Sequence, residues 1–367
     1  MNREESLERA RAAVQQILPI CTRRGRILVL MQDNPDPDAL ASAMAFRELV
    51  RHHLNRPVAI GYGGICGRAE NRAMLHVLRV RAVRLAPVQL RSFRTICLVD
   101  TQPGFGNNIL IRDRMPDIVI DHHVLSKRHR WTAAFADVRP EYGATATILY
   151  EYLTAGGVRI TTNLATGLFY GIQSDTQDLG REGSPADARA YQELFQKADK
   201  RKLARIRRAP VPAAYFKTLS ESLANCVLAG RTVIACVPDC RNADMVAEIA
   251  DMLLRLDGVR AAVCYGVCGG KIHLSARAVD ARGNMAGRMK RAVARLGVGG
   301  GHRAMAGGQI PVEGDPAKRL QLVYDRILKA FAQNRPVRSL GDIAKPPAAC
   351  TGGPEDLPAQ SDSTLGE

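Results

Sequence analysis

The sequence predicts an α/β protein with a mainly parallel sheet in its N-terminal domain, a helical connector and a smaller C-terminal α/β domain. Short apolar runs alternate with helical patterns over residues 26–172, an order typical of βαβ units. Gly269-Gly270 between two strand-like runs predicts a hairpin in the C-terminal half. The chain has 367 residues, which is long enough for two domains with buried cores.

The N-terminal elements follow from the period of the apolar residues. Leu7, Ala10, Val14 and Ile17 recur at helical spacing, so a helix is expected over residues 7–20. Compact apolar runs predict strands, and longer periodic segments predict helices. The expected strands are 26–32, 58–62, 80–85, 95–100, 117–121 and 131–137, and the expected helices are 39–53, 144–155 and 164–172.

The later elements have clear start and stop residues. Ser184-Pro185 pairs a helix cap with a proline at the first helical position, so helices are expected over 185–226. Strands are expected at 232–237, 260–267, 271–279 and 309–312, and helices up to 296 and over 316–331. The predicted domains are therefore 1–184, the connector 185–226, 227–335, and a disordered tail 336–367 rich in Pro, Gly, Ser and acid.

The composition indicates an ordinary globular protein with an anionic partner. The net charge of +16 favours nucleic acid, nucleotide or an acidic membrane surface, although solvated arginine-rich faces explain it equally well. The nine cysteines are odd in number and scattered, which suits a reducing compartment. No long apolar run or signal-peptide pattern occurs, so we expect a cytoplasmic protein without a membrane span.

Acidic residues and histidines follow several predicted strands. Asp36 and Asp38 come after the first strand, Asp100 ends another, and Asp121-His122-His123 ends a third. Ligands of open α/β sheets bind at these carboxyl ends. Each aspartate alone would be a turn or cap residue, but the set matches a two-metal site for Mn²⁺ or Mg²⁺, and histidine favours Mn²⁺. A zinc protease is excluded by the absence of a His-x-x-x-His pair.

Taken in order, the motifs resemble those of the DHH phosphoesterase superfamily. The N-terminal motifs are Asn34–Asp38, Val99-Asp100-Thr101, Asp121-His122-His123 and Ser174-Asp175-Thr176. The C-terminal part is similar to a DHHA1 domain, with Ser275-Ala276-Arg277, Gly299-Gly300-Gly301-His302 and Gly307-Gly308. The resemblance covers residues 20–335 and is nearest to nanoRNase/pAp-phosphatase enzymes.

The resemblance implies a role for each motif residue. One metal ion would be held by Asp36, Asp100 and Gln32, with Gln32 in the place of a histidine. Asp100 would bridge to the second ion. Asp121 would orient the histidines, and His123 would orient or protonate a phosphate oxygen. The full implied set has the second-metal ligands Asp38, Asp100, His122 and Asp175, and the substrate-binding residues Arg277, Gly300, Gly301 and His302.

The expected function is a metal-dependent phosphoesterase in which two ions, Mn²⁺ or else Mg²⁺ or Co²⁺, activate water. The resemblance implies short RNA or DNA oligonucleotides, dinucleotides or 3′-phosphoadenosine 5′-phosphate (pAp) as substrates, and a homodimer. Only 5% of residues are aromatic, which argues against a processive exonuclease on long strands. The glycine-rich motif favours an esterase over a pyrophosphatase.

Three features leave alternatives open. Gln32 is a weaker ligand than histidine, so the chain could instead be a nucleotide-binding regulatory protein with a weakened metal site. Residues 200–208 (KRKLARIRR) fit either a nucleic-acid contact or a solvated connector helix, and the +16 charge also permits a scaffold docked on membrane or nucleic acid. Two C-x₃-C pairs, Cys236/Cys240 and Cys264/Cys268, are read as buried apolar residues rather than a zinc site.

Overall fold

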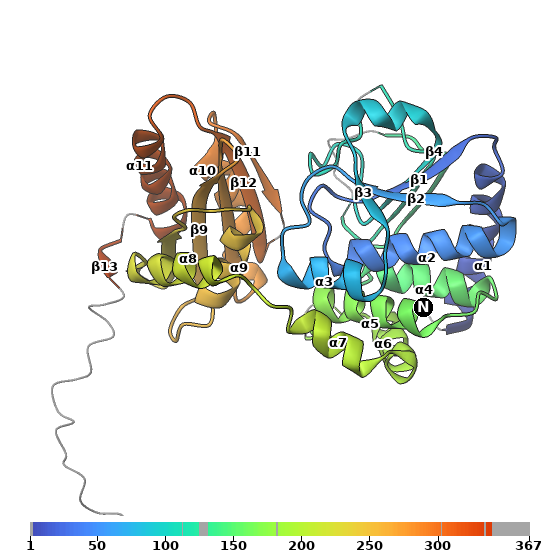
Figure 1. Cartoon of the computed structure of the whole chain (residues 1–367). Coiled ribbons are helices and arrows are strands. Elements are labelled where there is room, and N and C mark those ends of the chain that lie inside the picture. The colour runs from blue at the N-terminus through green and yellow to red at the C-terminus, as the bar shows by residue number, and fades with distance from the viewer. Residues whose placement is uncertain are drawn as a thin grey trace, which may run out of the picture. The chain divides into compact units, whose positions relative to one another are not determined.

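The chain divides into two units, Met1–Val211 and Pro212–Glu367. The computed structural model describes residues 3–111, 113–124, 131–180, 183–301, 303–333 and 335–339. Figure 1 shows the elements of both units, coloured along the chain. Since each unit has its own sheet and its own apolar core, each is described separately.

A six-stranded, wholly parallel sheet forms the centre of the first unit, in the order β3-β2-β1-β4-β5-β6. The predicted parallel α/β architecture is thereby confirmed. The strands are β1 Arg26–Leu30, β2 Val58–Tyr62, β3 Ala82–Arg84, β4 Phe93–Val99, β5 Ile118–Asp121 and β6 Phe135–Val138.

Side chains of β1 alternate between two cores, as the two-residue period of a strand requires. Ile27 and Val29 pack into the larger cluster with the helices, while Leu28 and Leu30 join a smaller cluster on the opposite face. Figure 1 shows α1, α2, α4 and α5 together on one side of this sheet. The helices are α1 Arg3–Cys21, α2 Pro37–Leu54, α3 Ala69–Val77, α4 Thr145–Ala155, α5 Thr162–Thr176, α6 Pro185–Lys197 and α7 Lys200–Arg207.

The strand order creates a switch point at the carboxyl ends of β1 and β4. From β1 the chain continues outward to β2 and β3, whereas β4 on the other side leads to β5 and β6. The connections therefore diverge and leave a crevice between the two strands, where ligands of such sheets bind. The loop after β1, the residue after β4 and the end of β5 all meet at this edge.

The second unit contains a seven-stranded sheet in the order β11-β12-β10-β9-β8-β7-β13. Only the pair β8–β9 is parallel. Its strands are β7 Val227–Ala229, β8 Thr232–Cys236, β9 Ala261–Cys268, β10 Lys271–Ala278, β11 Val298–Gly301, β12 Met305–Pro311 and β13 Val337–Ser339. Its helices are α8 Ala213–Ala224, α9 Asp244–Leu253, α10 Met285–Val293 and α11 Pro316–Ile327, which continues as a π-helical turn Leu328–Ala332.

Most predicted elements are present, and the differences have physical causes. The Gly269-Gly270 hairpin is confirmed between β9 and β10. The glycines 299–301, which follow the helix predicted up to residue 296, form the unpredicted strand β11 against β12. Residues 337–339 of the predicted tail pair with β7 as β13, and residues from 340 onward lie outside the described part of the chain. Helices α3 and α9 were not predicted.

The segment predicted as a connector is divided between the units. Helices α6 and α7 belong to the first unit, and α8 belongs to the second. Ser184 does cap α6, as its sequence indicates, and Asp187 completes a capping box by accepting from the Ser184 backbone N–H at 2.8 Å. Among the described residues, no helix is both long and apolar enough to cross a membrane.

Candidate metal centre

Asp38 is fixed against the start of α4, although the two residues are far apart in sequence. Its Oδ2 accepts from the Thr145 backbone N–H at 2.7 Å, and its Oδ1 accepts from the Ala146 N–H at 2.7 Å. These N–H groups lie in the first turn of α4, where they have no partner within the helix. The carboxylate is therefore rigid and buried, with 1% of its surface exposed.

Asp100 lies directly beyond β4, at the centre of the cluster. Its backbone has φ +58°, a left-handed conformation that aspartate tolerates better than most residues. Its Oδ1 accepts from the Thr145 hydroxyl at 3.1 Å, and the residue is 2% exposed. The turn thus aims a buried carboxylate back over the end of the sheet.

His122 presents one ring nitrogen to the carboxylates. Its Nδ1 lies 3.1 Å from the Tyr142 carbonyl oxygen, which accepts from the Nδ1–H tautomer. In that tautomer Nε2 has a lone pair, and this atom lies 3.1 Å from Asp175 Oδ2 and 3.7 Å from Asp100 Oδ1. A backbone carbonyl that orients the other nitrogen is the usual support of a metal-binding histidine.

The donor set fits a divalent cation. The groups Asp38, His122, Asp175 and Asp100, His122, His123 each place their ligand atoms within 4.8 Å of one another. Without a cation, the lone pair of His122 Nε2 would face carboxylate oxygens and repel them. Some of these groups must therefore be protonated when no cation is bound. Burial first, and then Asp175, raise the pKa of Asp38 to about 7. Although burial opposes it, a hydrogen bond from His122 to Asp175 raises the histidine pKa to about 10.

Asp121 forms a hydrogen-bonded pair with His123, which also belongs to the second ligand group. Asp121 Oδ1 lies 2.8 Å from His123 Nδ1, and Gln102 Nε2 donates to Asp121 Oδ2 at 2.7 Å. Burial opposes ionisation of Asp121, but the hydrogen bond with His123 prevails and lowers its pKa. Asp121 is fully buried and belongs to neither ligand group, so its contacts suit orientation of His123.

Gln32 lies between two of the predicted metal ligands. Its Nε2 donates to Asp36 Oδ2 at 2.8 Å and lies 3.4 Å from Asp100 Oδ2. Asp36 Oδ1 already caps α2 by accepting from the Ala39 N–H at 2.9 Å. The amide nitrogen, rather than its oxygen, thus faces the carboxylates, and Gln32 must turn its amide before it can ligate an ion.

The predicted substrate-binding residues belong to the second unit. Arg277, on β10, donates from Nε to Asp251 Oδ1 at 2.6 Å, and its side chain is 14% exposed. Gly300 and Gly301 lie on the edge strand β11, which pairs with β12 on one side, so every second N–H group of the strand points away from the sheet. A Cβ at Gly301 would lie 2.3 Å from the Met305 oxygen, whereas one at Gly300 would meet no atom within 4 Å. His302 lies outside the described residues.

Gln102 and Thr145 support the site but were not singled out from the sequence. Gln102 Nε2 donates to the His123 carbonyl at 2.9 Å as well as to Asp121. Thr145 contacts both Asp38 and Asp100. The sequence could have indicated Gln102, because it lies only two residues after Asp100. Thr145 offered none, because its partners are distant in sequence.

Comparison with known families agrees with this geometry. Residues 26–172 match the family described as "DHH family, N-terminal domain", and residues 230–333 match "DHHA1 domain". The first match contains the strand-end acids and histidines up to His123. The second contains Arg277 and the glycines of β11.

Individual relatives cover the chain to different extents. An uncharacterised protein of Methanocaldococcus jannaschii is 36% identical over 292 residues, which is 79% of this chain and 59% of the relative. A probable manganese-dependent inorganic pyrophosphatase of Exiguobacterium sp. is 30% identical over 150 residues, which is 41% of this chain and 48% of the relative. The chain thus spans less than two thirds of both curated relatives.

Among solved structures, an exopolyphosphatase-related protein from Bacteroides fragilis has a similar fold. It superposes with a TM-score of 0.67 at 16% identity, covering 87% of this chain and 96% of that chain. At this identity the likeness concerns the fold alone.

Proposed function

This chain belongs to the DHH family, and we propose that it is a metal-dependent phosphoesterase that hydrolyses short oligonucleotides, dinucleotides or pAp. The observation that carries the proposal is the pair of ligand groups sharing His122 at the switch point of the sheet. Carboxylates together with one oriented imidazole are ligands that suit Mn²⁺ or Mg²⁺.

Asp38, His122 and Asp175 would hold one divalent ion, and Asp100 would share it or bridge to a second ion. Such an ion, when bound, polarises a phosphoryl oxygen and lowers the pKa of water. The choice of Mn²⁺ is supported by the histidine in the set and by the manganese-dependent relative from Exiguobacterium. The second ion is part of the proposal, since it depends on Asp36, Asp100 and Gln32.

The chain's other groups have proposed roles in binding and proton transfer. His123, held by Asp121, would exchange a proton with a phosphate oxygen through its Nε2, because Nδ1 is engaged by Asp121. In the second unit, Arg277 and the glycine backbone of β11 at Gly300 and Gly301 would bind a substrate phosphate. His302 retains its predicted role as a further phosphate contact.

The test is a substrate panel with Mn²⁺, Mg²⁺ and Co²⁺. We expect release of mononucleotides from short RNA, or of phosphate from pAp, that EDTA abolishes. His122→Ala should reduce turnover at least about 100-fold, since it removes a ligand shared by both groups. The exposed residue His52 provides the matched control, His52→Ala, which should retain activity. Hydrolysis of pyrophosphate alone would overturn the proposed substrate class.

A regulatory nucleotide-binding protein is the second candidate, and the contacts of Gln32 favour it. An amide that donates to both Asp36 and Asp100 competes with an ion for the same oxygens. Binding of a dinucleotide in the presence of Mn²⁺ without any turnover would support this second function. Turnover by the wild-type chain would exclude it.

A further inference from the structure

Helix α7 forms a basic ridge on the first unit, apart from the metal centre. Leu203 and Ile206 point inward and anchor the helix in the core. Lys200, Ala204 and Arg207 recur at helical spacing along one flank of the ridge. Lys202 and Arg205 lie on the opposite flank. Each flank faces its own hollow.

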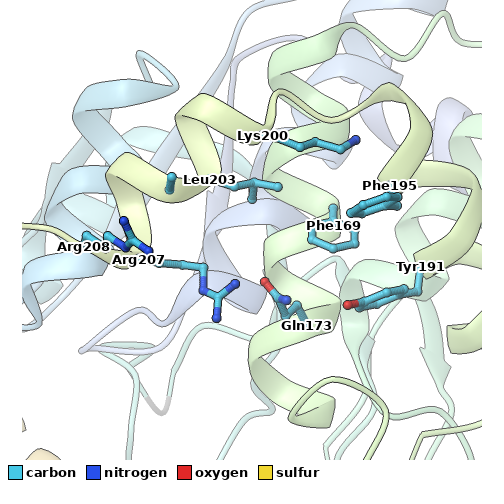
Figure 2. A pocket seen from close by; sticks show the side chains of 9 residues that line it. Phe169, Gln173, Tyr191, Phe195, Lys200, Leu203, Arg207 and Arg208 are labelled. Carbon is cyan, nitrogen blue, oxygen red and sulfur yellow. The ribbon is translucent and has the colours of Figure 1, made fainter. Parts of the chain in front are cut away.

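The first hollow, here called the aromatic hollow, is a cavity of about 430 Å³ between α5, α6 and α7 (Figure 2). The ring centroids of Phe169 and Tyr191 are 4.6 Å apart, and those of Phe169 and Phe195 are 5.5 Å apart. Phe195 is 48% exposed, and Lys200 Nζ lies 4.0 Å from its ring centroid. Aromatic rings beside cationic side chains suit a base with its phosphate.

Gln173 adds an unused acceptor to the aromatic hollow. Its Nε2 donates to Asp178 Oδ1 at 2.6 Å, which fixes the orientation of the amide. Its Oε1 is buried and has no hydrogen-bond partner among the described residues. A buried carbonyl oxygen without a partner is costly, so a donor from a ligand, such as the amino group of a base, would stabilise it.

The second hollow, here called the basic hollow, has a volume of about 1060 Å³ and lies where α3 packs near α7. Among the described residues, no acidic side chain lines it, whereas five cationic ones do: Arg72, Arg79, Arg81, Lys202 and Arg205. Within the described residues, Arg79, Arg81 and Arg205 form no ion pair. Like charges gathered without counter-charges oppose folding, and a bound polyanion would neutralise them.

We propose that this surface, the two hollows and the ridge of α7 between them, binds a single strand of nucleic acid outside the metal centre. Bases would stack in the aromatic hollow with an amino group on Gln173 Oε1, and phosphates would cross α7 into the basic hollow. The choice of nucleic acid rests on the proposed function, and the site extends the substrate class to strands longer than a dinucleotide.

Binding is measured by fluorescence anisotropy with a labelled single-stranded RNA of about 12 nucleotides, in EDTA. The variant Arg79→Ala/Arg81→Ala/Arg205→Ala should weaken binding about 10- to 100-fold. In a plot of log affinity against log salt concentration, the slope of this variant should be less steep than that of wild type by about 2, because each of the three lost phosphate contacts contributes about 0.7. The control Arg11→Ala/Arg24→Ala/Arg91→Ala removes the same charge from exposed sites elsewhere in the unit and should bind like wild type.

The aromatic hollow is tested separately. Phe195→Ala should weaken binding of the strand by about 5- to 100-fold with an unchanged salt slope, because it removes stacking rather than charge. Gln173→Leu should weaken binding of an adenine or cytosine strand more than that of a uracil strand, since uracil has no amino group. If both variants bind the strand with wild-type affinity, no base binds in this hollow and the proposal is overturned.

The outcomes also separate this site from the proposed function. RNA binding in EDTA without hydrolysis in Mn²⁺ would overturn the phosphoesterase proposal and leave this site intact. Hydrolysis of dinucleotides together with equal strand binding by the triple variant and its control would overturn this site alone. If the wild-type chain instead binds vesicles of phosphatidylglycerol and not RNA, the partner is an anionic membrane and the nucleic-acid assignment is wrong.

Discussion

At the scale of single residues, Gln32 is expected to affect what the proposed metal centre can bind. Its amide nitrogen contacts Asp36 and lies 3.4 Å from Asp100, so the side chain occupies the space between two prospective ligands. Ion binding there requires loss of these contacts and rotation of the amide. Since an amide oxygen is a weaker donor than imidazole, we expect the ion held by Asp36 and Asp100 to bind more weakly.

Gln32→His should therefore strengthen binding of this ion by about tenfold or more, the scale on which changes near a metal alter its affinity. Titration calorimetry with Mn²⁺ on both proteins gives the affinity and the number of ions directly, without an activity assay. Gln16→His, on the exposed side of α1, is the control for adding a histidine. Equal affinities in wild type and Gln32→His would contradict the expectation.

We propose that Asp121 acts on the chemistry through His123, and its variant should show this. Asp121→Asn weakens the 2.8 Å hydrogen bond that orients the ring, so kcat should fall about 10- to 100-fold with little change in KM. Steady-state kinetics on the substrate identified by the panel measures both constants. A rise in KM with constant kcat would show that Asp121 serves binding instead. Asp113→Asn, in an exposed loop, is the control.

At the scale of elements, a buried ion cluster joins β6 to α4 beneath the site. Arg139 is fully buried, donates from Nη2 to Asp137 Oδ2 at 2.6 Å and from Nη1 to Glu151 Oε2 at 2.6 Å. The Tyr152 hydroxyl also donates to Asp137 Oδ2 at 2.6 Å. Because α4 supplies the N–H groups that hold Asp38, the cluster also helps to fix the position of Asp38.

Asp137→Asn should lower the free energy of unfolding by about 3–5 kcal/mol, because Arg139 would remain buried without its full counter-charge. Urea denaturation measures this difference, with Asp257→Asn on the surface of the second unit as control. A loss below about 1 kcal/mol would mean that the ion pair of Arg139 with Glu151 is sufficient to stabilise the cluster without Asp137.

The contribution of Asp137 should also depend on pH. Burial opposes its ionisation, but the hydrogen bond from Arg139 prevails, so its pKa is below the ordinary value near 3.9. A group whose pKa is lower in the folded state stabilises the fold above its unfolded pKa, and this stabilisation is lost as the pH falls through the folded pKa. The difference between wild type and Asp137→Asn should therefore be constant near neutrality and shrink below about pH 4.

At the scale of the whole molecule, the two units have separate cores and separate chemistry. The clusters around β1 and α2 belong to the first unit, and those around β9, α9 and α10 belong to the second. All residues of both ligand groups lie in the first unit, as does the ridge of α7. Metal affinity should therefore be a property of the first unit.

Ile249→Ala tests this division. Ile249 is fully buried in the core of the second unit, so its truncation should cost about 2–5 kcal/mol of unfolding free energy. Under conditions where the protein remains folded, calorimetric titration should give the wild-type Mn²⁺ affinity. A reduced affinity would show that the second unit contributes to the metal centre.

The sequence by itself determined the order of the elements and the kinds of side chain that could carry chemistry. The apolar run of β1, the cap Asp36 before Pro37, and the acids at strand ends are local patterns, and each depends only on neighbouring residues. Local periodicity did not reveal α9 or the strand β11, whose glycines form a strand because β12 pairs with them.

Only the tertiary structure decided which of these side chains meet. Asp38 is held by Thr145, 107 positions away, and Gln32 turns its amide nitrogen toward Asp100. Likewise, the sequence of α7 predicts a basic helix but does not distinguish a nucleic-acid contact from a solvated connector. Its position between two hollows follows from its packing near α3, α5 and α6. The physical reason is that these contacts join distant segments, and packing of the whole core fixes their positions.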